Sequence, residues 1–375
     1  MLSCSKSFAK GCVSAVKKYQ RVENWVKEGL KSGELKAGDL LPSEAEICAL
    51  FSVGRNSVRT ALNNLSHAGY VETKKGIGTF CRSGNKPAIT NIGFICFFAH
   101  SYIFPRMVAG CEEVLYRNGY HLLLNQSEFN LEKEREVLEK LRKNKVAGIV
   151  IEPVFSGRGE SNADLLHDFE AAGIPVVLID NYFPAEEFSS IAMDDQLGGR
   201  LMAQHLIERG HRDIGILYKE NYYPKVLRKE GSYDYLAERN VDVTEEWLVG
   251  YAGPPSPGQI YAAADRLLAD PMRRPTAVIC TSDEESVELI NAAEARGLTL
   301  PEELSIVSFD NSSLAQLPRL SLTSINHPSH YIGSIAATML LERVGHPEVQ
   351  SYSSVRIRPE LVERTSVKQL DSVRL

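Results

Sequence analysis

Three stretches in the first quarter of the chain carry hydrophobic residues at helical spacing. In residues 19–32 the apolar side chains lie three or four positions apart, which predicts an amphipathic helix. Ser43, with Glu46 three positions later, forms the capping-box pattern that satisfies free amide groups at a helix start. A second helix is therefore expected to reach about residue 51, with three apolar side chains facing inward. These are Ile47, Leu50 and Phe51.

After a turn at 52–54, the helical spacing resumes in a third stretch that ends at Gly69. Its inward face carries Val58, Ala61, Leu62 and Leu65. Two short strands, 70–73 and 79–81, then flank a segment rich in lysine and glycine, which predicts a hairpin. Two short helices joined by a tight turn and followed by a basic hairpin are typical of a DNA-reading domain.

The outer face of the third helix carries side chains that are suited to reading bases. Arg55 and Arg59 lie four positions apart, with Asn56 and Ser57 beside the first of them. In a major groove, arginine can donate two hydrogen bonds to guanine, and asparagine can bond to adenine. The sequence therefore predicts that this helix enters the groove.

The hairpin and the distribution of charge support the same prediction. Lys74 and Lys75 can reach a phosphate or the minor groove, and Gly76 lets the backbone pass close to DNA. Residues 1–86 hold 14 Lys and Arg against 7 Asp and Glu, whereas the rest of the chain holds 28 against 41. A basic domain on an acidic body is typical of nucleic-acid binding. The alternative is a solvated helical bundle with a charged face.

From residue 91 onward, short apolar runs alternate with amphipathic stretches. This alternation predicts parallel sheets covered by helices on both faces, and the length of the region favours two lobes. The fold class expected here is an α/β body of two Rossmann-like lobes, with an α+β domain before it. The apolar runs are 91–98, 121–124, 146–151, 175–179, 213–217, 276–280 and 304–309, with helical stretches such as 131–142, 197–209 and 286–296 between them.

Polar and aromatic side chains follow several of these runs, where ligands of parallel-sheet proteins bind. Carboxylates can accept hydrogen bonds from adjacent hydroxyls, arginine donates a planar fork, and aromatic rings can pack on the apolar face of a sugar. The alternative for any single Asp is a turn former or helix cap. Arg228 is expected to begin a helix. The candidate effector-binding residues are Tyr102, Phe104, Asp180, Arg228, Asp283, Asp310 and His327.

Composition excludes several other classes of protein. No apolar run is long enough to cross a membrane, and residues 1–18 lack the apolar core of a signal peptide. The seven cysteines are odd in number and show no metal-binding spacing, which favours reduced thiols in a cytoplasm. No nucleophile–base pair is evident, and neither an enzyme nor a cofactor or metal site is predicted.

The pattern over residues 19–82 resembles the winged helix-turn-helix domain of the GntR family. The resemblance rests on LPSE at 41–44, SVRTAL at 57–62 and GIGTF at 76–80. It implies that Pro42 and Ser43 approach the DNA backbone and that Gly76 shapes the tip of the wing. Two positions depart from the family: Ala45 stands where a basic residue is common, and Gly54 stands where a serine cap is usual.

Residues 91–367 resemble the effector domain of the LacI family, which shares the fold of periplasmic sugar-binding proteins. The motifs are GRLMAQHLIERGHRDIGIL at 199–217, LTSINHP at 322–328 and RPELVERTS at 358–366. By this resemblance Asp180, Arg228, Asp283, Asp310 and His327 match ligand-contacting or cleft-lining positions. A GntR head on a LacI body is the layout of arabinose-responsive repressors, which implies arabinose or a related monosaccharide as effector.

The sequence therefore predicts a ligand-controlled transcription regulator, most simply a repressor, that binds a near-palindromic double-stranded DNA operator as a homodimer. A sugar receptor without a DNA role and a sugar-acting enzyme are the alternatives. The expected divisions are an extension (1–18), a winged helix-turn-helix domain (19–82), a linker (83–90), a two-lobed effector and dimerisation domain (91–367) and a tail (368–375).

Overall fold

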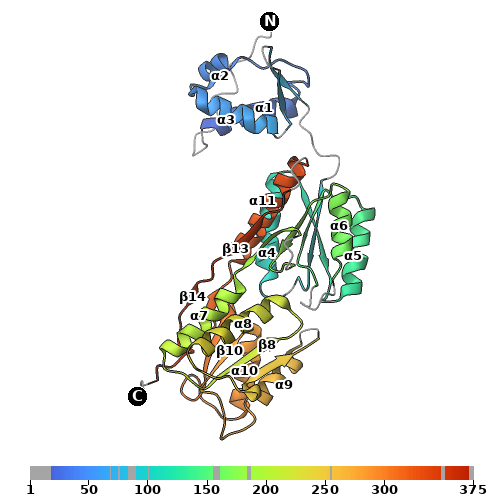
Figure 1. Cartoon of the computed structure of the whole chain (residues 1–375). Coiled ribbons are helices and arrows are strands. Elements are labelled where there is room, and N and C mark those ends of the chain that lie inside the picture. The colour runs from blue at the N-terminus through green and yellow to red at the C-terminus, as the bar shows by residue number, and fades with distance from the viewer. Residues whose placement is uncertain are drawn as a thin grey trace. The chain divides into compact units, whose positions relative to one another are not determined.

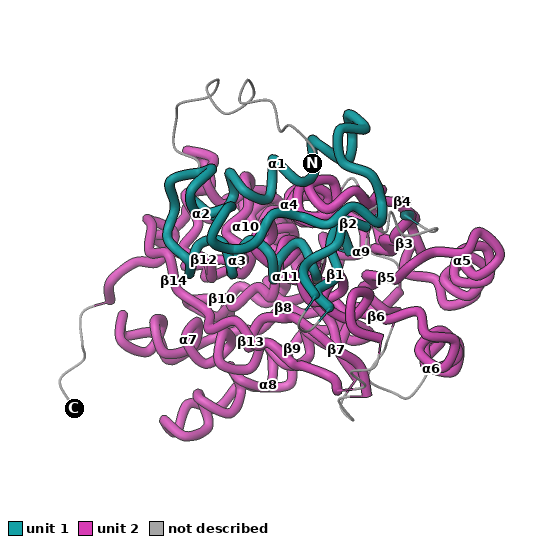
Figure 2. Tube along the Cα trace, turned by 90° about the horizontal axis from the view of Figure 1, so that it is seen from above, with its two compact units in different colours: residues 1–90 teal, residues 91–375 magenta. Residues whose placement is uncertain are grey.

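The computed structural model divides the chain into two compact units, residues 1–90 and 91–375 (Figure 2). The residues that it describes are 18–67, 69–74, 77–82, 90–99, 101–154, 161–183, 187–253, 256–347 and 351–370. Most of the predicted extension and linker, the end of the tail, and Lys75 and Gly76 lie outside these residues. Residues 1–90 are called the head, and residues 91–375 are called the body.

The head contains three helices and a hairpin (Figure 1). These are α1 (Lys18–Ser32), α2 (Glu44–Phe51), α3 (Arg55–His67), β1 (Val71–Lys74) and β2 (Gly78–Cys81). The strands pair antiparallel, and Leu40 forms one further bridge to Phe80. The capping box is present: the Ser43 amide donates to Glu46 Oε2 at 2.8 Å, and the Glu46 amide donates to Ser43 Oγ at 3.4 Å.

A single apolar core holds the three helices together, and the inward positions of α1 and α3 agree with the predicted spacing. Val22, Val26, Val58 and Leu65 are fully buried. One prediction is wrong: Leu50 is 40% exposed. The short helix α2 packs on the core through Ile47 and Phe51, and the Phe51 ring lies 5.4 Å from the Trp25 ring, so Leu50 is left on the outer flank.

The body contains two six-stranded sheets, one in each lobe, as the predicted fold class requires. The strand order is β13-β7-β6-β5-β3-β4 in lobe 1 and β14-β12-β11-β10-β8-β9 in lobe 2. All neighbours are parallel except β12 and β14, which pair antiparallel at an edge. In lobe 1 the strands are β3 (Asn91–Cys96), β4 (His121–Gln126), β5 (Gly148–Ile151), β6 (Val176–Ile179), β7 (Ser189–Met193) and β13 (Ser354–Ile357). In lobe 2 they are β8 (Ile214–Lys219), β9 (Leu248–Tyr251), β10 (Ala277–Cys280), β11 (Ser305–Asp310), β12 (Thr323–Asn326) and β14 (Leu361–Val362).

In each lobe, the five strands that come first along the chain lie in the same spatial order across the sheet: second, first, third, fourth, fifth. These strands are β3 to β7 in lobe 1 and β8 to β12 in lobe 2. In such a sheet the loops after the first and third strands diverge, and a crevice opens at their carboxyl ends. In lobe 1 this crevice lies after β3 and β5, and in lobe 2 it lies after β8 and β10. The sequence runs that fill these strands are buried on both faces, as expected for parallel strands covered by helices.

Helices cover the sheets of both lobes (Figure 1). Two of these helices, α7 and α11, directly follow a crossing of the chain from one lobe to the other. After β7 the chain crosses to lobe 2, where α7 packs on α8, and after β12 it returns to lobe 1, where α11 packs on α4. A Cβ added to Gly199 would lie 2.0 Å from the Arg228 carbonyl oxygen, so α7 and α8 touch backbone to backbone. The helices are α4 (Phe104–Arg117), α5 (Leu131–Lys143), α6 (Ala163–Ala171), α7 (Asp195–Glu208), α8 (Tyr223–Glu238), α9 (Pro257–Leu267), α10 (Asp283–Ala295), α11 (Ser329–Gly345) and a 3-10 turn at Glu245–Trp247.

No helix among the described residues is long and apolar enough to cross a bilayer.

Candidate functional site

The outer face of α3 presents the predicted DNA-reading side chains to solvent. Arg55, Asn56 and Arg59 are exposed, and Ser57 is half-buried. Arg59 is held by an exposed ion pair, in which its Nε lies 3.0 Å from Glu44 Oε2 at the start of α2. This face can offer a forked cation and an amide to a groove, which is the chemistry of direct base recognition.

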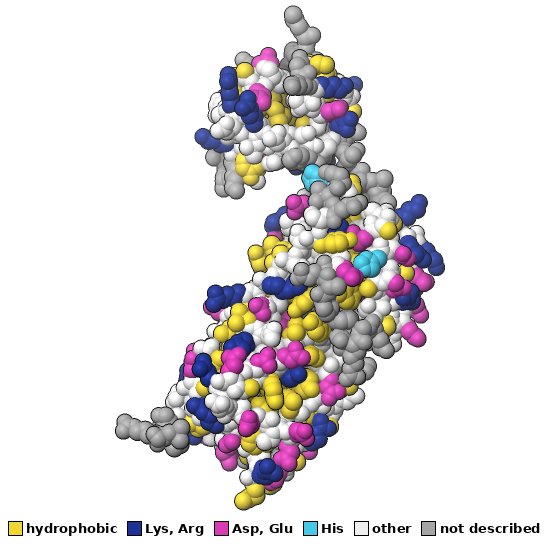
Figure 3. All heavy atoms as spheres, viewed as in Figure 1, with side chains coloured by type: hydrophobic (Ala, Val, Ile, Leu, Met, Phe, Trp, Pro, Cys, Tyr) yellow, Lys and Arg dark blue, Asp and Glu magenta, His cyan; other side chains and the backbone are white. Residues whose placement is uncertain are grey.

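The other predicted DNA contacts surround this helix in the head. Pro42 is half-buried and Ser43 is exposed just before α2, and Lys74 is exposed at the end of β1. The Ser43 hydroxyl donates to Glu46 Oε2 at 2.8 Å, and this bond holds the pKa of the Glu46 carboxyl below its usual value. Lys and Arg side chains are prominent on the visible face of the head, whereas both signs of charge are interspersed over the body (Figure 3).

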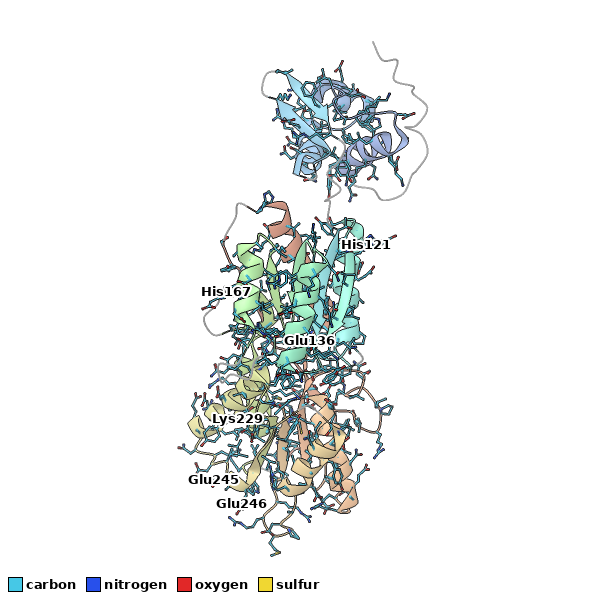
Figure 4. The ribbon with its side chains drawn as sticks, turned by 90° about the vertical axis from the view of Figure 1, so that its right-hand side faces the viewer. His121, Glu136, His167, Lys229, Glu245 and Glu246 are labelled. Carbon is cyan, nitrogen blue, oxygen red and sulfur yellow. The ribbon has the colours of Figure 1, made fainter. Side chains whose placement is uncertain are left out.

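A cavity of about 570 Å³, part of it open to solvent, lies between the two lobes of the body. Side chains from both lobes crowd this junction in Figure 4, where His121, Glu136 and His167 mark lobe 1 and Lys229, Glu245 and Glu246 mark lobe 2. The side chains that line this cavity come from both lobes. Lobe 1 lines it with Phe97, Phe98, Ser101, Tyr102, Ile103, Phe104, Phe129, Glu152 and Asp180, and lobe 2 with Lys219, Tyr222, Lys225, Arg228, Glu284 and Asp310.

Two tyrosine hydroxyls join the lobes across this pocket, one from each side. Tyr102 of lobe 1 donates to Asp310 Oδ2 at 2.5 Å, and Tyr222 of lobe 2 donates to Glu152 Oε1 at 2.6 Å. Burial, together with the neighbouring carboxylates, raises the pKa of both phenols well above 10. Both hydroxyls therefore keep their protons and act as donors.

Arg228 lines the pocket from lobe 2, and it is buried among several partners. Its Nε donates to Asp195 Oδ1 at 2.7 Å, its Nη1 donates to the Thr281 carbonyl at 2.8 Å and to Asp310 Oδ1 at 3.4 Å, and its guanidinium carbon lies 3.6 Å from the centre of the Phe309 ring. Burial raises the pKa of Asp195 to about 7 and that of Asp310 to about 6, although Arg228 opposes both shifts. The arginine therefore fixes two buried carboxyls.

The prediction that Arg228 begins a helix is wrong, because α8 begins five residues earlier at Tyr223. Pro224 occupies the first turn of α8, where its missing amide hydrogen costs nothing and its fixed φ favours the helix. Arg228 consequently lies in the second turn. Lys225 and Arg228, three positions apart, share the face of α8 that lines the pocket.

Two lysines line the pocket beside this arginine, and they differ in their partners. Lys225 donates to Ser282 Oγ at 2.8 Å and to Glu285 Oε1 at 2.9 Å. Lys219, the last residue of β8, has no hydrogen bond or ion pair to a described residue, and its Nζ lies 3.7 Å from the centre of the Phe129 ring of lobe 1. Burial, with the charge of Lys225, lowers the pKa of Lys219 to about 7.

On the lobe 1 side, two buried carboxyls each keep one oxygen without a described partner. These oxygens are Glu152 Oε2 and Asp180 Oδ2. The other Asp180 oxygen lies 2.7 Å from His327 Nε2, and His327 Nδ1 lies 2.8 Å from Ser329 Oγ. His327 does not line the pocket itself, so its contact with a ligand would pass through Asp180.

Asp283 does not line the pocket either, contrary to the expectation that it contacts the ligand. It is fully buried, and its Oδ1 accepts from Ser308 and Ser324 while its Oδ2 accepts from the Ser312 amide. As the first residue of α10, it ties that helix to strands β11 and β12 and to the loop after β11. Its three hydrogen bonds leave it a role in holding the sheet end together.

The structure thus brings Tyr102, Phe104, Asp180, Arg228 and Asp310 into one pocket, together with residues that were not predicted from the sequence. Glu152, Lys219 and Tyr222 are the most important of these. Glu152 and Lys219 also stand at the ends of strands, so the rule that selected Asp180 could have found them. Tyr222 follows no apolar run directly, and only the fold places it there.

Within the described residues, no group of three or more His, Cys, Asp and Glu side chains could hold a metal ion, and their cysteines are free thiols.

Comparison with known proteins identifies both parts of the chain. Residues 18–81 match the family model of bacterial regulatory proteins of the gntR family, and residues 203–367 match that of a periplasmic binding protein-like domain. The chain is 32% identical over 358 residues to the arabinose metabolism transcriptional repressor of Geobacillus stearothermophilus, covering 94% of this chain and 98% of the relative.

Two solved structures share the fold of the body. The transcription regulator CcpA of Lactococcus lactis is 26% identical and has a TM-score of 0.66, covering 75% of this chain and 100% of that chain. A LacI family transcriptional regulator from Enterococcus faecium, solved with bound ribose, is 24% identical and has a TM-score of 0.65, with the same coverage. These relatives are transcription regulators and not enzymes. The chain belongs to the family of transcriptional repressors that join a GntR-type DNA-binding domain to a periplasmic-binding-protein-like effector domain.

Proposed function

We propose that this repressor leaves its operator when a small neutral sugar binds between the two lobes, with arabinose as the first candidate and another pentose or hexose as the second. The observation that carries the proposal is the pocket wall, which both lobes build from buried polar side chains. A ligand that bonds to both walls stabilises one relative position of the lobes, and a ligand shifts an equilibrium only through such differential contacts.

The chemistry of the wall favours a neutral polyhydroxy ligand. Carboxyls of Glu152 and Asp180 face the cavity from lobe 1, and the amino group of Lys219, the Arg228 guanidinium and the Asp310 carboxyl face it from lobe 2. A ligand with a large net charge of either sign would meet a group of the same sign in this pocket. A hydroxyl group both donates and accepts, so it can bond to a carboxylate and to a nitrogen donor at once.

The choice of arabinose rests on the name of the relative from Geobacillus stearothermophilus, which matches this chain over nearly its whole length. The ribose held by the regulator from Enterococcus faecium supports the wider class of monosaccharides. The aromatic rings of Phe97, Phe129 and Tyr222, whose centres lie 4.8 to 6.1 Å apart, give the pocket an apolar surface for a sugar ring.

On the DNA side, we propose that α3 enters the major groove and that Arg55 and Arg59 contact bases or phosphates. Asn56 and Ser57 would join them from the same face, Pro42 and Ser43 would meet the backbone, and the wing would follow a phosphate or the minor groove. One head contacts few bases, so a homodimer on a near-palindromic operator is proposed. Free thiols and a DNA target support a cytoplasmic location.

A thermal-shift screen of the full chain against pentoses and hexoses tests the effector. A sugar that binds only the folded state raises the melting temperature by mass action. Arabinose is expected to give the largest rise, and its alditol and arabinose 5-phosphate are the matched controls for ring and charge. If no monosaccharide shifts melting while the phosphorylated sugar does, the proposed ligand class is wrong.

A further inference from the structure

Lys219 is the one cation of the pocket wall that has no hydrogen bond or ion pair to a described residue. Arg228 and Lys225, which line the same wall, each bind buried carboxylates. The ammonium of Lys219 instead lies over the Phe129 ring, and the residue is 3% exposed. A buried ammonium without an acceptor is costly, so the protein favours its neutral amine.

The surroundings of Lys219 combine the features that make a lysine nucleophilic: an apolar setting and a second cation nearby. Phe97, Phe129 and Tyr222 form the apolar cluster around this part of the pocket. The charged groups that act on the amine are Lys225 of α8, Glu284 and Glu285 of α10, and Glu152 after β5. Burial and the Lys225 charge together lower the pKa of Lys219 to about 7.

Reaction of an amine with an aldehyde also needs a group that can donate a proton in the same pocket, and Glu152 is such a group. Its Oε1 accepts from Tyr222, while its Oε2 has no described partner, and it lines the same pocket as Lys219. Burial, followed by the charge of Asp180, raises the pKa of this carboxyl well above its usual value. Glu152 therefore keeps its proton to a higher pH than an ordinary glutamate does.

We propose that Lys219 is a nucleophilic lysine that forms a reversible imine with the carbonyl carbon of a small aldehyde, such as the open-chain form of an aldose. The nitrogen lone pair forms the C–N bond, and the carbonyl oxygen takes a proton to give a carbinolamine. That oxygen then leaves as water after a second protonation, for which Glu152 is the donor. The nitrogen loses both of its protons overall, so amine and aldehyde give imine and water without any oxidant or reductant.

Imine formation depends on the pocket alone and does not require that a sugar release the repressor from DNA. The pocket would distinguish a reducing sugar from the corresponding alditol by imine formation as well as by shape, because an alditol has no aldehyde group. It also marks Lys219 as the site where reactive aldehydes would modify the repressor.

Reductive trapping tests the proposal on the full chain. The protein is incubated with glyceraldehyde and cyanoborohydride, which converts an imine into a stable secondary amine, and the modified lysines are mapped by mass spectrometry. Lys140, whose side chain is 68% exposed, is the internal reference in the same digest. At pH 7 we expect Lys219 to be modified at least about ten times faster, because an ordinary lysine with a pKa of about 10.4 is almost fully protonated there.

The pH profile and three variants complete the test. The rate at Lys219 is expected to level off above about pH 8, because its pKa is about 7. K219R abolishes the pocket adduct, and E152Q slows adduct formation at Lys219. E284Q replaces another carboxyl of the same pocket, one that has no part in the proposed proton transfer, and is expected not to slow adduct formation. If Lys219 in the folded protein is modified no faster than Lys140, the proposal is overturned, and a wild-type rate in E152Q overturns the role of Glu152.

Discussion

The head and the body each present an arginine for recognition, but the two side chains are held in opposite ways. Arg59 is 63% exposed and has one ion pair, with Glu44, which is itself 40% exposed. Arg228 is 3% exposed and has two carboxylates, one carbonyl and one aromatic face as partners. An exposed arginine can re-orient toward a phosphate or a base, and salt screens its field. A buried arginine is fixed before the ligand arrives.

This difference determines how binding of each ligand depends on a single arginine. In the head, the arginine is exposed, so each contact with a DNA phosphate is weak and is screened by salt. Affinity for DNA therefore depends on the salt concentration and on the sum of several such contacts. In the pocket, the carboxyls of Asp195 and Asp310 depend on Arg228 for their charge balance. Removing one arginine therefore weakens one contact in the head but disrupts a network in the body.

The largest effect is expected for Arg228→Ala, which leaves Asp195 and Asp310 buried without their cation. The free energy of unfolding of the body should fall by about 3–5 kcal/mol, and sugar binding should be lost. Denaturant unfolding and calorimetry measure the two effects. Arg200→Ala, which breaks an ion pair that is 34% and 54% exposed, is the control and should cost at most about 1 kcal/mol. Wild-type sugar affinity in Arg228→Ala would remove this arginine from the site.

The next effect is expected at the operator. Arg59→Ala should weaken binding by roughly 1–3 kcal/mol if the side chain reads a base pair, without changing the stability of the head by a similar amount. Gel shift at fixed salt measures this. Arg273→Ala in the body removes an arginine of matching exposure, 62%, that pairs with Glu246, and it should leave operator binding unchanged. Equal affinity of wild type, Arg55→Ala and Arg59→Ala would contradict the assignment of α3.

A smaller effect separates a ligand contact from a structural residue. Asp283→Asn turns one acceptor of the Ser312 amide into a donor, or removes an acceptor from two serines, so the body should lose about 1–3 kcal/mol of stability. Sugar affinity at a temperature where the variant is folded should stay within a few-fold of wild type. A loss of affinity as large as that of Arg228→Ala would return Asp283 to the pocket.

The last effect concerns Lys219, which has no partner among the described residues, and it has the opposite sign. The pKa of Lys219 is about 7 in the folded protein and about 10.4 in an unfolded chain, so the folded state carries a destabilising charge below pH 7. Between pH 7 and about 10.4 the unfolded chain keeps a proton that the folded protein has lost. In this range the destabilisation by Lys219 therefore falls steadily as the pH rises, and it is gone near pH 10.4. Lys219→Met should therefore raise the melting temperature of the ligand-free protein most at pH 6 and least at pH 10. Melting curves across this range would contradict the idea if the rise were equal at both ends.

Sequence reasoning reached the two parts of the molecule to different depths. In the head, apolar spacing and the Ser43–Glu46 pair are local signals, and they predicted the helices apart from the exposure of Leu50. In the body, the alternation of strands and helices predicted the two lobes, and the strand-end rule selected Asp180, Arg228 and Asp310. The same rule could not tell Asp283 from these, because whether a carboxylate faces a cavity or three internal donors depends on serines up to 41 positions away.

The hydrogen bonds that join the two lobes could not be predicted from the sequence pattern. Tyr102 and Asp310 are 208 positions apart, and Tyr222 and Glu152 are 70 apart. Each contact exists only because the chain crosses between the lobes and brings two sheet ends face to face. The edge strand β14 was missed for a related reason: two residues give too short a pattern, and its antiparallel pairing with β12 comes from the final crossing.

A sugar bound in the body and an operator bound at the head are expected to weaken each other's binding. The most direct test is the affinity of the full chain for a labelled duplex, selected from a random library, measured by fluorescence anisotropy with and without saturating arabinose at one salt concentration. We expect an affinity ratio of about 5 to 150, which corresponds to a coupling of about 1–3 kcal/mol, and the same ratio for arabinose affinity with and without the duplex. A ratio of one, with arabinose shown by calorimetry to be bound, would mean that the two sites are not coupled.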